Sequence, residues 1–190
     1  MHLMTRSGTA STGSDMSELE KLDMASITKF RFVGAVEAEQ TTSTDEDSLP
    51  VALQKLLAEI ATFYHVVHEA HWNVTGADFY QYHKFFDEIV SDVYDSIDPI
   101  AENIRKLGSK PAYRMSELFK QSTLPDNDIK TDNAVALAGT LGDLNKKIID
   151  ILKNTFDLAN KINEQGVANF IAERIDAHQK WQWFLEASTG

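Results

Sequence analysis

The stretch of sequence from residue 78 to residue 107 limits the fold of this chain more than any other. Its apolar residues recur every three or four positions, which is the spacing of one face of an α-helix. The set comprises Phe79, Phe86, Ile89, Val90, Val93, Ile97, Ile100 and Ile104. The pattern predicts one long amphipathic helix, whose apolar face has to be buried against other elements.

The same predicted helix carries four potential metal ligands on one side. We place His83 at zero and advance by about 100° per residue, the angle that the helical repeat requires. Asp87 then falls near 40°, Asp98 near 60° and Glu102 near 100°, all rough values from that repeat. Asp92 falls at roughly 180° on the same count, so it is expected to point away from this side, on the solvated surface.

The rise along the helix axis determines how these ligands can act together. At about 1.5 Å per residue, Asp98 lies roughly 16 Å from Asp87 and 22 Å from His83, too far for one ion to join them within a chain. An antiparallel copy of the helix, packed across a two-fold axis, would place Asp98 and Glu102 of one subunit beside His83 and Asp87 of the other. The ligand set is therefore expected to be complete only in a dimer.

A further histidine precedes this helix. His71 lies about one turn before the end of the preceding predicted helix, and a tight turn at residues 75 to 78 would bring it to the height of His83. Nitrogen and carboxylate ligands without sulfur suit Fe(II), Mn(II) or Zn(II), whereas two histidines argue against calcium or magnesium. On the residues alone, a helical scaffold with a hydrated polar face stays open. The predicted metal site consists of His71, His83 and Asp87 of one chain with Asp98 and Glu102 of its partner.

These residues resemble the signature of the Dps family of mini-ferritins. The motif reads His71-Trp72-Asn73 followed by Gly76, then His83-x-x-x-Asp87, then Asp98-x-x-x-Glu102, and the resemblance covers residues 49 to 188. It implies a ferritin-like four-helix bundle, a hollow dodecamer, and a di-iron ferroxidase centre at each two-fold interface, where zinc or manganese can substitute. Family members oxidise Fe(II), preferentially with hydrogen peroxide, and store Fe(III) as an oxide.

The resemblance also implies roles for four other residues. Trp72 is expected near the metal centre as a radical trap, although a tryptophan is more often part of a core. Asp157, Glu164 and Glu173 could line an acidic ion-entry pore, and a solvated helix end is the alternative. The Glu-x-x-His pairs of larger ferritins occur nowhere in this chain, so the site between subunits is the expected iron centre.

Three further long helices and one short helix are predicted. Ser48 caps the first, with Pro50 tolerated in its first turn. Gly108 ends the second, and the long connection that follows lets the third run parallel to it, as in ferritin-like bundles with one crossover. Thr131 and Asp132 cap the third helix, and Asn163 begins the last. The predicted helices are residues 49 to 74, 78 to 107, 115 to 121, 131 to 160, and from 163 onward.

Three histidines of the predicted helices lie outside the predicted ligand set. His65 and His68 lie away from the centre of the apolar stripe of the first helix and are predicted on the surface. His178 lies on the apolar stripe of the last helix and has no carboxylate partner at ligand spacing. It is predicted in the core or at an interface.

Residues 1 to 48 differ in composition from the rest. They are rich in serine, threonine, glycine and acidic residues, and their four basic and nine acidic residues give a net charge of −5. They are predicted to form an extension that is partly disordered, or docked as an arm through the apolar patch at residues 27 to 33. The bundle is predicted to occupy residues 49 to 190.

Charge and composition narrow the class of partners. The net charge of −11 disfavours binding to DNA or to anionic membranes, which depends on clustered lysine and arginine. DNA binding is therefore expected to be weak or absent, and a nucleoid-compacting stress protein with incidental metal sites is the alternative function. The absence of cysteine excludes disulfides and thiolate metal sites. No apolar run could span a membrane and no secretory signal is seen, so a cytoplasmic location is expected.

Overall fold

The computed structural model describes residues 48 to 125 and 129 to 190. Within these ranges the secondary structure is helical, which confirms the all-α prediction. The predictions for residues 1 to 47, including the arm at residues 27 to 33, lie outside the described residues. The helices are α2 (Leu49–Asn73), α3 (Phe79–Lys106), α4 (Met115–Gln121), α5 (Ala134–Lys161) and α6 (Gln165–Ala187).

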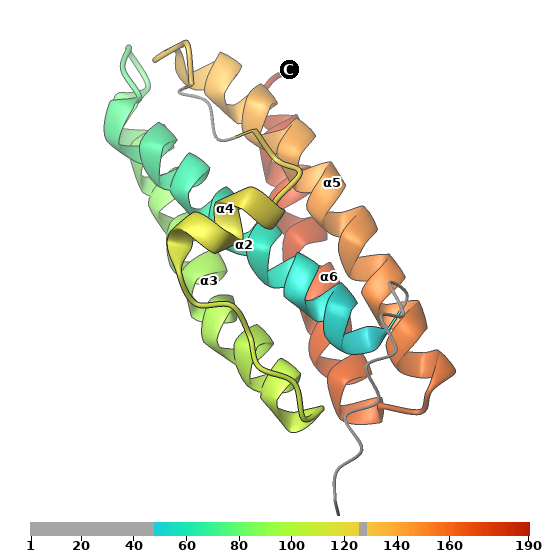
Figure 1. Cartoon of the computed structure of the whole chain (residues 1–190). Helices are drawn as coiled ribbons and strands as arrows, with labels where there is room; N and C mark the ends of the chain where they lie inside the picture. The colour runs from blue at the N-terminus through green and yellow to red at the C-terminus, as the bar shows by residue number, and fades with distance from the viewer. Residues whose placement is uncertain (1–47, 126–128) are drawn as a thin grey trace, which may run out of the picture. The chain divides into compact units, whose positions relative to one another are not determined.

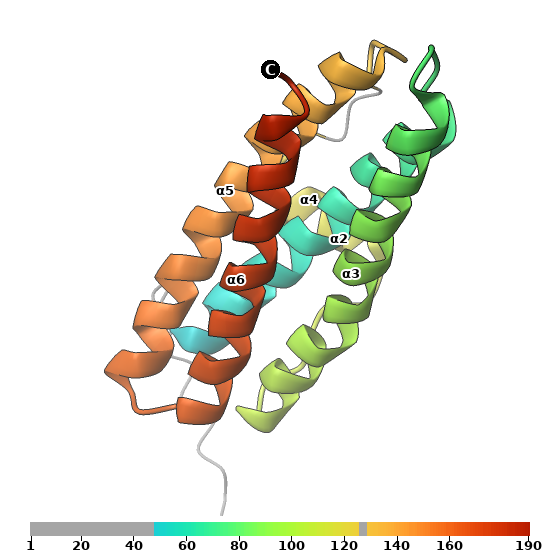
Figure 2. The same ribbon diagram turned by 180° about the vertical axis from the view of Figure 1, so that it is seen from behind.

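The four long helices form a bundle with one crossover. Helix α2 packs against α3 and α5, and α5 packs against α6. Figure 1 shows that α3 and α5 run in the same direction, and the view from behind in Figure 2 shows α6 returning beside α5. The short helix α4 lies in the crossover and packs on α2. This is the predicted ferritin-like arrangement.

The apolar stripe of α3 forms one wall of a single core. Phe86, Ile89 and Val93 are fully buried, and Ile100 and Ile104 continue the stripe toward the end of the helix. Phe79, at the first position of α3, is 43% exposed and is the exception to the predicted pattern. The helical periodicity therefore identified the core face of α3 except where the helix begins.

The crossover between α3 and α5 is anchored by a buried carboxylate on α2. Glu59 is fully buried and accepts four hydrogen bonds from the segment after α4. The donors are the Ser122 hydroxyl at 2.6 Å, the Thr123 backbone N–H and hydroxyl at 2.8 Å each, and the Leu124 N–H at 3.2 Å. A buried carboxylate needs such donors to offset its loss of hydration. Glu59 was not among the residues predicted from the sequence to have a structural or functional role.

The helix ends differ from the predictions at two places. Asn133, not Thr131 or Asp132, is the N-cap of α5, because its side-chain oxygen accepts the N–H of Ala136 at 3.0 Å. Asn163 does not begin α6. Its φ of +62° is a left-handed backbone conformation that forms the turn between α5 and α6, and asparagine tolerates it better than most residues.

The other helix boundaries agree with the predictions. Helix α4 spans the predicted residues 115 to 121. Ser48 occupies the N-cap position of α2 with Pro50 in the first turn, although the Ser48 side chain makes no capping hydrogen bond. Gly108 follows the end of α3 with a φ of +81°, which glycine adopts at little cost.

Asp92 is not a solvated surface residue, and that prediction was wrong. Its carboxylate accepts hydrogen bonds from Arg174 Nη1 at 3.0 Å, Arg174 Nη2 at 2.7 Å and Trp181 Nε1 at 2.7 Å. Burial by itself would raise the pKa of Asp92, but the hydrogen bonds from Arg174 and Trp181 and the positive charge of Arg174 hold this pKa below its usual value. The residue joins α3 to α6.

His178 lies in the core, as predicted. It is fully buried, and its Nδ1 donates to Asn145 Oδ1 at 2.6 Å, while Asn145 Nδ2 donates to the His178 carbonyl at 2.8 Å and to Gln182 Oε1 at 3.0 Å. Burial lowers the pKa of His178 to about 3, and the charge of Arg174 acts in the same direction. The imidazole is therefore neutral at physiological pH.

Within residues 48 to 125 and 129 to 190, no helix combines the length and the hydropathy that crossing a bilayer requires.

Candidate metal centre

A tight connection joins α2 to α3 and positions the two histidines of the predicted site. Val74 donates its N–H to the Ala70 carbonyl at the end of α2, and Gly76 turns the chain with a φ of +112°. The Thr75 N–H donates to the Asp132 carbonyl at 2.8 Å, which ties the turn to the segment before α5. The C-terminal end of α2 and the N-terminal end of α3 are thereby held side by side.

His71 and His83 form a reciprocal pair across this connection. His71 Nδ1 lies 2.8 Å from the His83 carbonyl oxygen, and His83 Nδ1 lies 2.8 Å from the His71 carbonyl oxygen. A carbonyl oxygen only accepts, so each Nδ1 carries a hydrogen. In the neutral imidazoles the Nε2 atoms then hold the lone pairs, and the other ring nitrogen is fixed as in many metal-binding histidines. The two rings stack with centroids 3.9 Å apart and planes at 20°.

Asp87 lies beside this pair. Its Oδ1 is 4.0 Å from His71 Nε2, and its side chain is half-exposed, whereas the His71 side chain is 12% exposed. The structure thus brings His71 close both to His83 and to Asp87.

Asp98 and Glu102 do not join these three residues within one chain. Both are exposed on the later part of α3, and at about 1.5 Å per residue Asp98 is roughly 16 Å from Asp87. Among the residues described, no three histidine, cysteine or acidic side chains come close enough to hold a metal ion. A complete ligand set would therefore need donors from a second subunit.

An apolar groove of about 660 Å³ borders Asp98. Helices α2, α3 and α4 form it together with the connection that precedes α4, and its walls include Tyr94, Tyr113 and Met115. These three side chains are 60%, 74% and 40% exposed, which is unusual for large apolar groups that lie close together. The groove could not be predicted from the sequence, because it depends on the position of α4.

Trp72 is 68% exposed, so the expectation of a core tryptophan does not hold in the single chain. Its ring packs on His68, with centroids 4.3 Å apart. His65 is exposed, which confirms its predicted surface position, but His68 is half-buried. Burial lowers the pKa of His68, repulsion from His71 lowers it further, and attraction to Asp87 opposes both effects.

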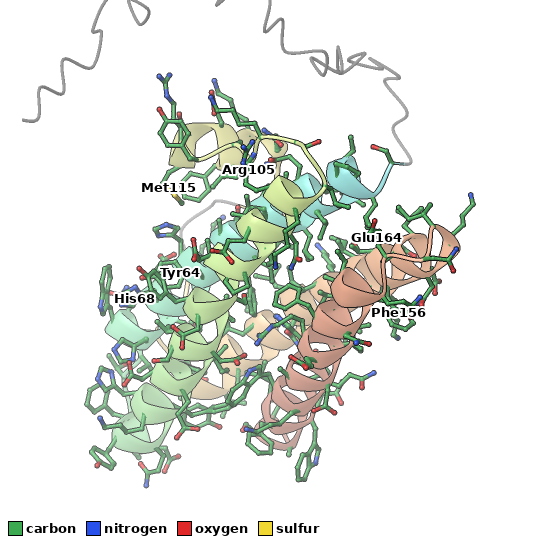
Figure 3. All side chains as sticks on the ribbon, turned by 90° about the horizontal axis from the view of Figure 1, so that it is seen from below. Tyr64, His68, Arg105, Met115, Phe156 and Glu164 are labelled. Carbon is green, nitrogen blue, oxygen red and sulfur yellow. The ribbon has the colours of Figure 1, made fainter. Side chains whose placement is uncertain are left out.

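The three residues predicted for an acidic pore flank the turn between α5 and α6. Asp157 is exposed on α5, Glu173 is exposed on α6, and Glu164 is the half-buried N-cap of α6. Figure 3 shows Glu164 at this turn. No hydrogen bond or ion pair connects the three within the part of the chain that the structure describes.

Comparisons with known proteins agree with this architecture. A family model for the ferritin-like domain matches residues 51–190. An uncharacterized protein of Haemophilus influenzae is 31% identical over 136 residues, which cover 72% of this chain and 84% of that protein. A DNA protection during starvation protein of Helicobacter pylori is 27% identical over 135 residues, covering 71% and 94%.

A solved structure is similar over the same region. The Dps protein of Vibrio cholerae, described as a member of a broad superfamily of ferritin-like diiron-carboxylate proteins, superposes with a TM-score of 0.70. It is 27% identical, and the match covers 73% of this chain and 87% of that chain.

Proposed function

Because this chain belongs to the Dps family of ferritin-like proteins, we propose that it is an iron-oxidising and iron-storing mini-ferritin. It oxidises Fe(II) with hydrogen peroxide at centres between two subunits. The Fe(III) product is stored as an oxide inside a hollow dodecamer in the cytoplasm. The observation that supports this most directly is the reciprocal pairing of His71 and His83, in which each Nδ1 is bound to a carbonyl and the Nε2 of His71 lies 4.0 Å from Asp87 Oδ1.

In the proposed centre, two subunits contribute different donors. One chain provides the two imidazoles and Asp87, and Asp98 and Glu102 of the partner subunit provide carboxylates. This mixture of nitrogen and oxygen donors without sulfur suits Fe(II), and Zn(II) or Mn(II) can take its place. The anionic carboxylates favour Fe(III) once it forms, while the neutral imidazoles hold a weaker second position.

The exposed apolar groove supports the two-fold dimer. A second copy of the chain, packed through antiparallel α3 helices, would cover Tyr94, Tyr113 and Met115, which are exposed in the single chain. Asp98 lines this groove. The same antiparallel packing would therefore bring Asp98 of the partner subunit near Asp87. Apolar burial and completion of the ligand set would then result from one contact.

The proposed reaction transfers two electrons to each hydrogen peroxide molecule. Two Fe(II) ions each give one electron to a hydrogen peroxide molecule, whose O–O bond breaks. With two protons, two water molecules form, so no hydroxyl radical is released. In this proposal Trp72, one residue after His71 and 68% exposed, reduces radicals that escape this pairing. Trp72→Phe should then raise the radical yield without slowing iron oxidation.

The proposed route of iron entry follows from the negative charge of three side chains. Asp157, Glu164 and Glu173 would attract Fe(II) to a pore where copies of the α5–α6 turn meet.

Several relatives are named for DNA protection. For this chain, with a net charge of −11, we propose that protection comes from the removal of iron and peroxide, with little direct binding to DNA.

Stopped-flow absorbance on the metal-free protein tests the proposed function. Two Fe(II) per site followed by peroxide should give rapid, saturable oxidation, and air should give slower oxidation. The double variant His71→Ala with His83→Ala should fall to the rate of the protein-free control while its size by gel filtration is unchanged. His65→Ala, an exposed histidine of the same helix, is the matched control. A double variant as fast as the wild type would contradict the proposal.

A further inference from the structure

Helix α2 carries another histidine beside the proposed ferroxidase centre, one helical turn before His71. The centroid of the His68 ring is 5.8 Å from that of the His71 ring, with the planes at 43°. Residues three apart are neighbours on a helix surface, so the two imidazoles share one side of α2. Figure 3 shows His68 and Tyr64 on the side of α2 that faces away from α6.

Two aromatic rings hold His68 in place. Trp72, four residues later, packs on it with centroids 4.3 Å apart, and Tyr64, four residues earlier, lies 5.4 Å away. Among the described residues no hydrogen bond involves either nitrogen of the His68 ring. The ring is therefore positioned by packing alone, and its nitrogens remain available to a ligand.

The spacing of the two rings suits a shared metal ion. An ion about 2.1 Å from an imidazole nitrogen lies roughly 3.2 Å from the ring centroid, so two imidazoles on one tetrahedral ion have centroids about 5 to 5.5 Å apart. The centroids of His68 and His71, 5.8 Å apart, are slightly farther from each other than that. The His71 Nδ1 is already occupied by the His83 carbonyl, so its Nε2 is the atom that can share the ion.

We propose that His68 is a third imidazole ligand of the centre, acting with His71 on the more weakly held of the two irons. This inference rests on the proposed function, because Asp87 and the carboxylates of the partner subunit complete the coordination. A neutral nitrogen donor adds no negative charge, so it binds Fe(II) without favouring Fe(III) as strongly as a carboxylate does. His68 would therefore hold the incoming ferrous ion and release it after oxidation.

His65 provides a matched control on the same helix. It lies three residues before His68, and its ring meets Phe119 of α4 edge-on, with centroids 5.3 Å apart. It is exposed and lines the groove between α2, α3 and α4. A histidine that binds metal only through surface exposure would behave like His65, and a ligand of the centre would not.

The absence of cysteine allows a test by gain of signal. A thiolate bound to Co(II) gives an intense charge-transfer absorption in the near ultraviolet, which imidazole and carboxylate do not give. We would prepare His68→Cys, His65→Cys and Asp87→Cys in the full chain and add two Co(II) per site under reducing conditions. The proposal predicts the absorption in the His68 and Asp87 variants and none in the His65 variant.

A second measurement uses the affinity for Co(II). His68→Gln should weaken the second equivalent by at least about tenfold and leave the first equivalent unchanged, while His65→Gln should change neither. Absorption in the Asp87 variant with none in the His68 variant would overturn this inference and leave the proposed centre standing. Absorption in neither would overturn both, and absorption in the His65 and His68 variants alike would show surface binding and overturn the inference.

Discussion

Replacing Asp92 with alanine would remove the acceptor of three hydrogen bonds that join α3 to α6. Arg174 donates two of them and Trp181 donates the third, at distances between 2.7 and 3.0 Å. The Arg174 side chain is only 12% exposed, and its Nε lacks a protein partner within the described structure. In the variant, a largely buried guanidinium would lose both its counter-charge and its acceptors.

The expected loss in the free energy of unfolding follows from the burial of Arg174. Removing one partner of a buried ion pair costs about 3–5 kcal/mol, because the other charge is left without compensation. The Asp92 side chain is 29% exposed, so water entering the space would solvate part of Arg174 and reduce the loss. We expect Asp92→Ala to lower the free energy of unfolding by about 2–4 kcal/mol. Changing Asp92 and Arg174 together to leucine should cost less than the single change, because no charge is left buried.

Urea unfolding followed by circular dichroism, at one fixed protein concentration, measures this difference. Glu88→Ala is the matched control, since Glu88 is an exposed acidic residue of the same helix, and it should stay within about 0.5 kcal/mol of the wild type. An Asp92→Ala variant as stable as this control would refute the reasoning. So would a double variant less stable than the single one.

The pH dependence of the same difference has a definite sign. The pKa of Asp92 is lower in the folded protein than its ordinary value of 3.8, because the hydrogen bonds and the charge of Arg174 outweigh the opposing effect of burial. The charged carboxylate therefore adds stability above pH 3.8, and this contribution is lost as the pH falls through the folded pKa. The gap between the wild type and Asp92→Ala should narrow in acid.

Three other substitutions and a change of pH have calculable effects on stability. Glu59→Gln replaces one acceptor oxygen by an NH₂ group that faces donors, so we expect a loss of about 1–3 kcal/mol in urea unfolding and faster proteolysis within residues 108 to 130. The pKa of His178 is lowered from 6.5 to about 3 in the folded protein, so the unfolded chain takes up the proton first as the pH falls. The free energy of unfolding should therefore fall by up to about 5 kcal/mol between pH 6.5 and pH 3. A His178→Gln variant whose stability depends on pH as steeply as that of the wild type would contradict this. Gly76→Ala should destabilise the protein by about 1–2 kcal/mol, because the φ of Gly76 is +112°. Gly166→Ala, in the first turn of α6, should stabilise the protein by up to about 1 kcal/mol.

The fold could be predicted because its determinants are local. The periodicity of α3, the bounds of α4 and the glycine after α3 depend on residues within one or two turns of each other. The two errors at helix ends have the same origin. Thr131, Asp132 and Asn133 can each cap a helix, and Asn163 suits both a cap and a left-handed turn. The choice between such neighbours depends on how the whole helix packs.

The paired histidines could be predicted for a related reason. His71 and His83 are twelve residues apart, and a short turn between two helices fixes their heights through the helical rise alone. His68 was missed as a neighbour of this pair because its distance from the centre of the apolar stripe indicated a surface position. Its burial comes from the rings of Trp72 and Tyr64, which are placed by side-chain rotamers rather than by periodicity.

The buried polar contacts could not be predicted in this way, because their partners are distant in the sequence. Asp92 meets Arg174 and Trp181 at separations of 82 and 89 residues, and Glu59 meets the crossover at 63 to 65. A helical wheel gives the direction of Asp92 but not the identity of the helix that lies there. For Glu59 a signal existed, because an acidic residue inside an apolar stripe must find donors or remain destabilising. A charged residue within a core-facing stripe is therefore better interpreted as the anchor of an unseen segment than as an exception to the stripe.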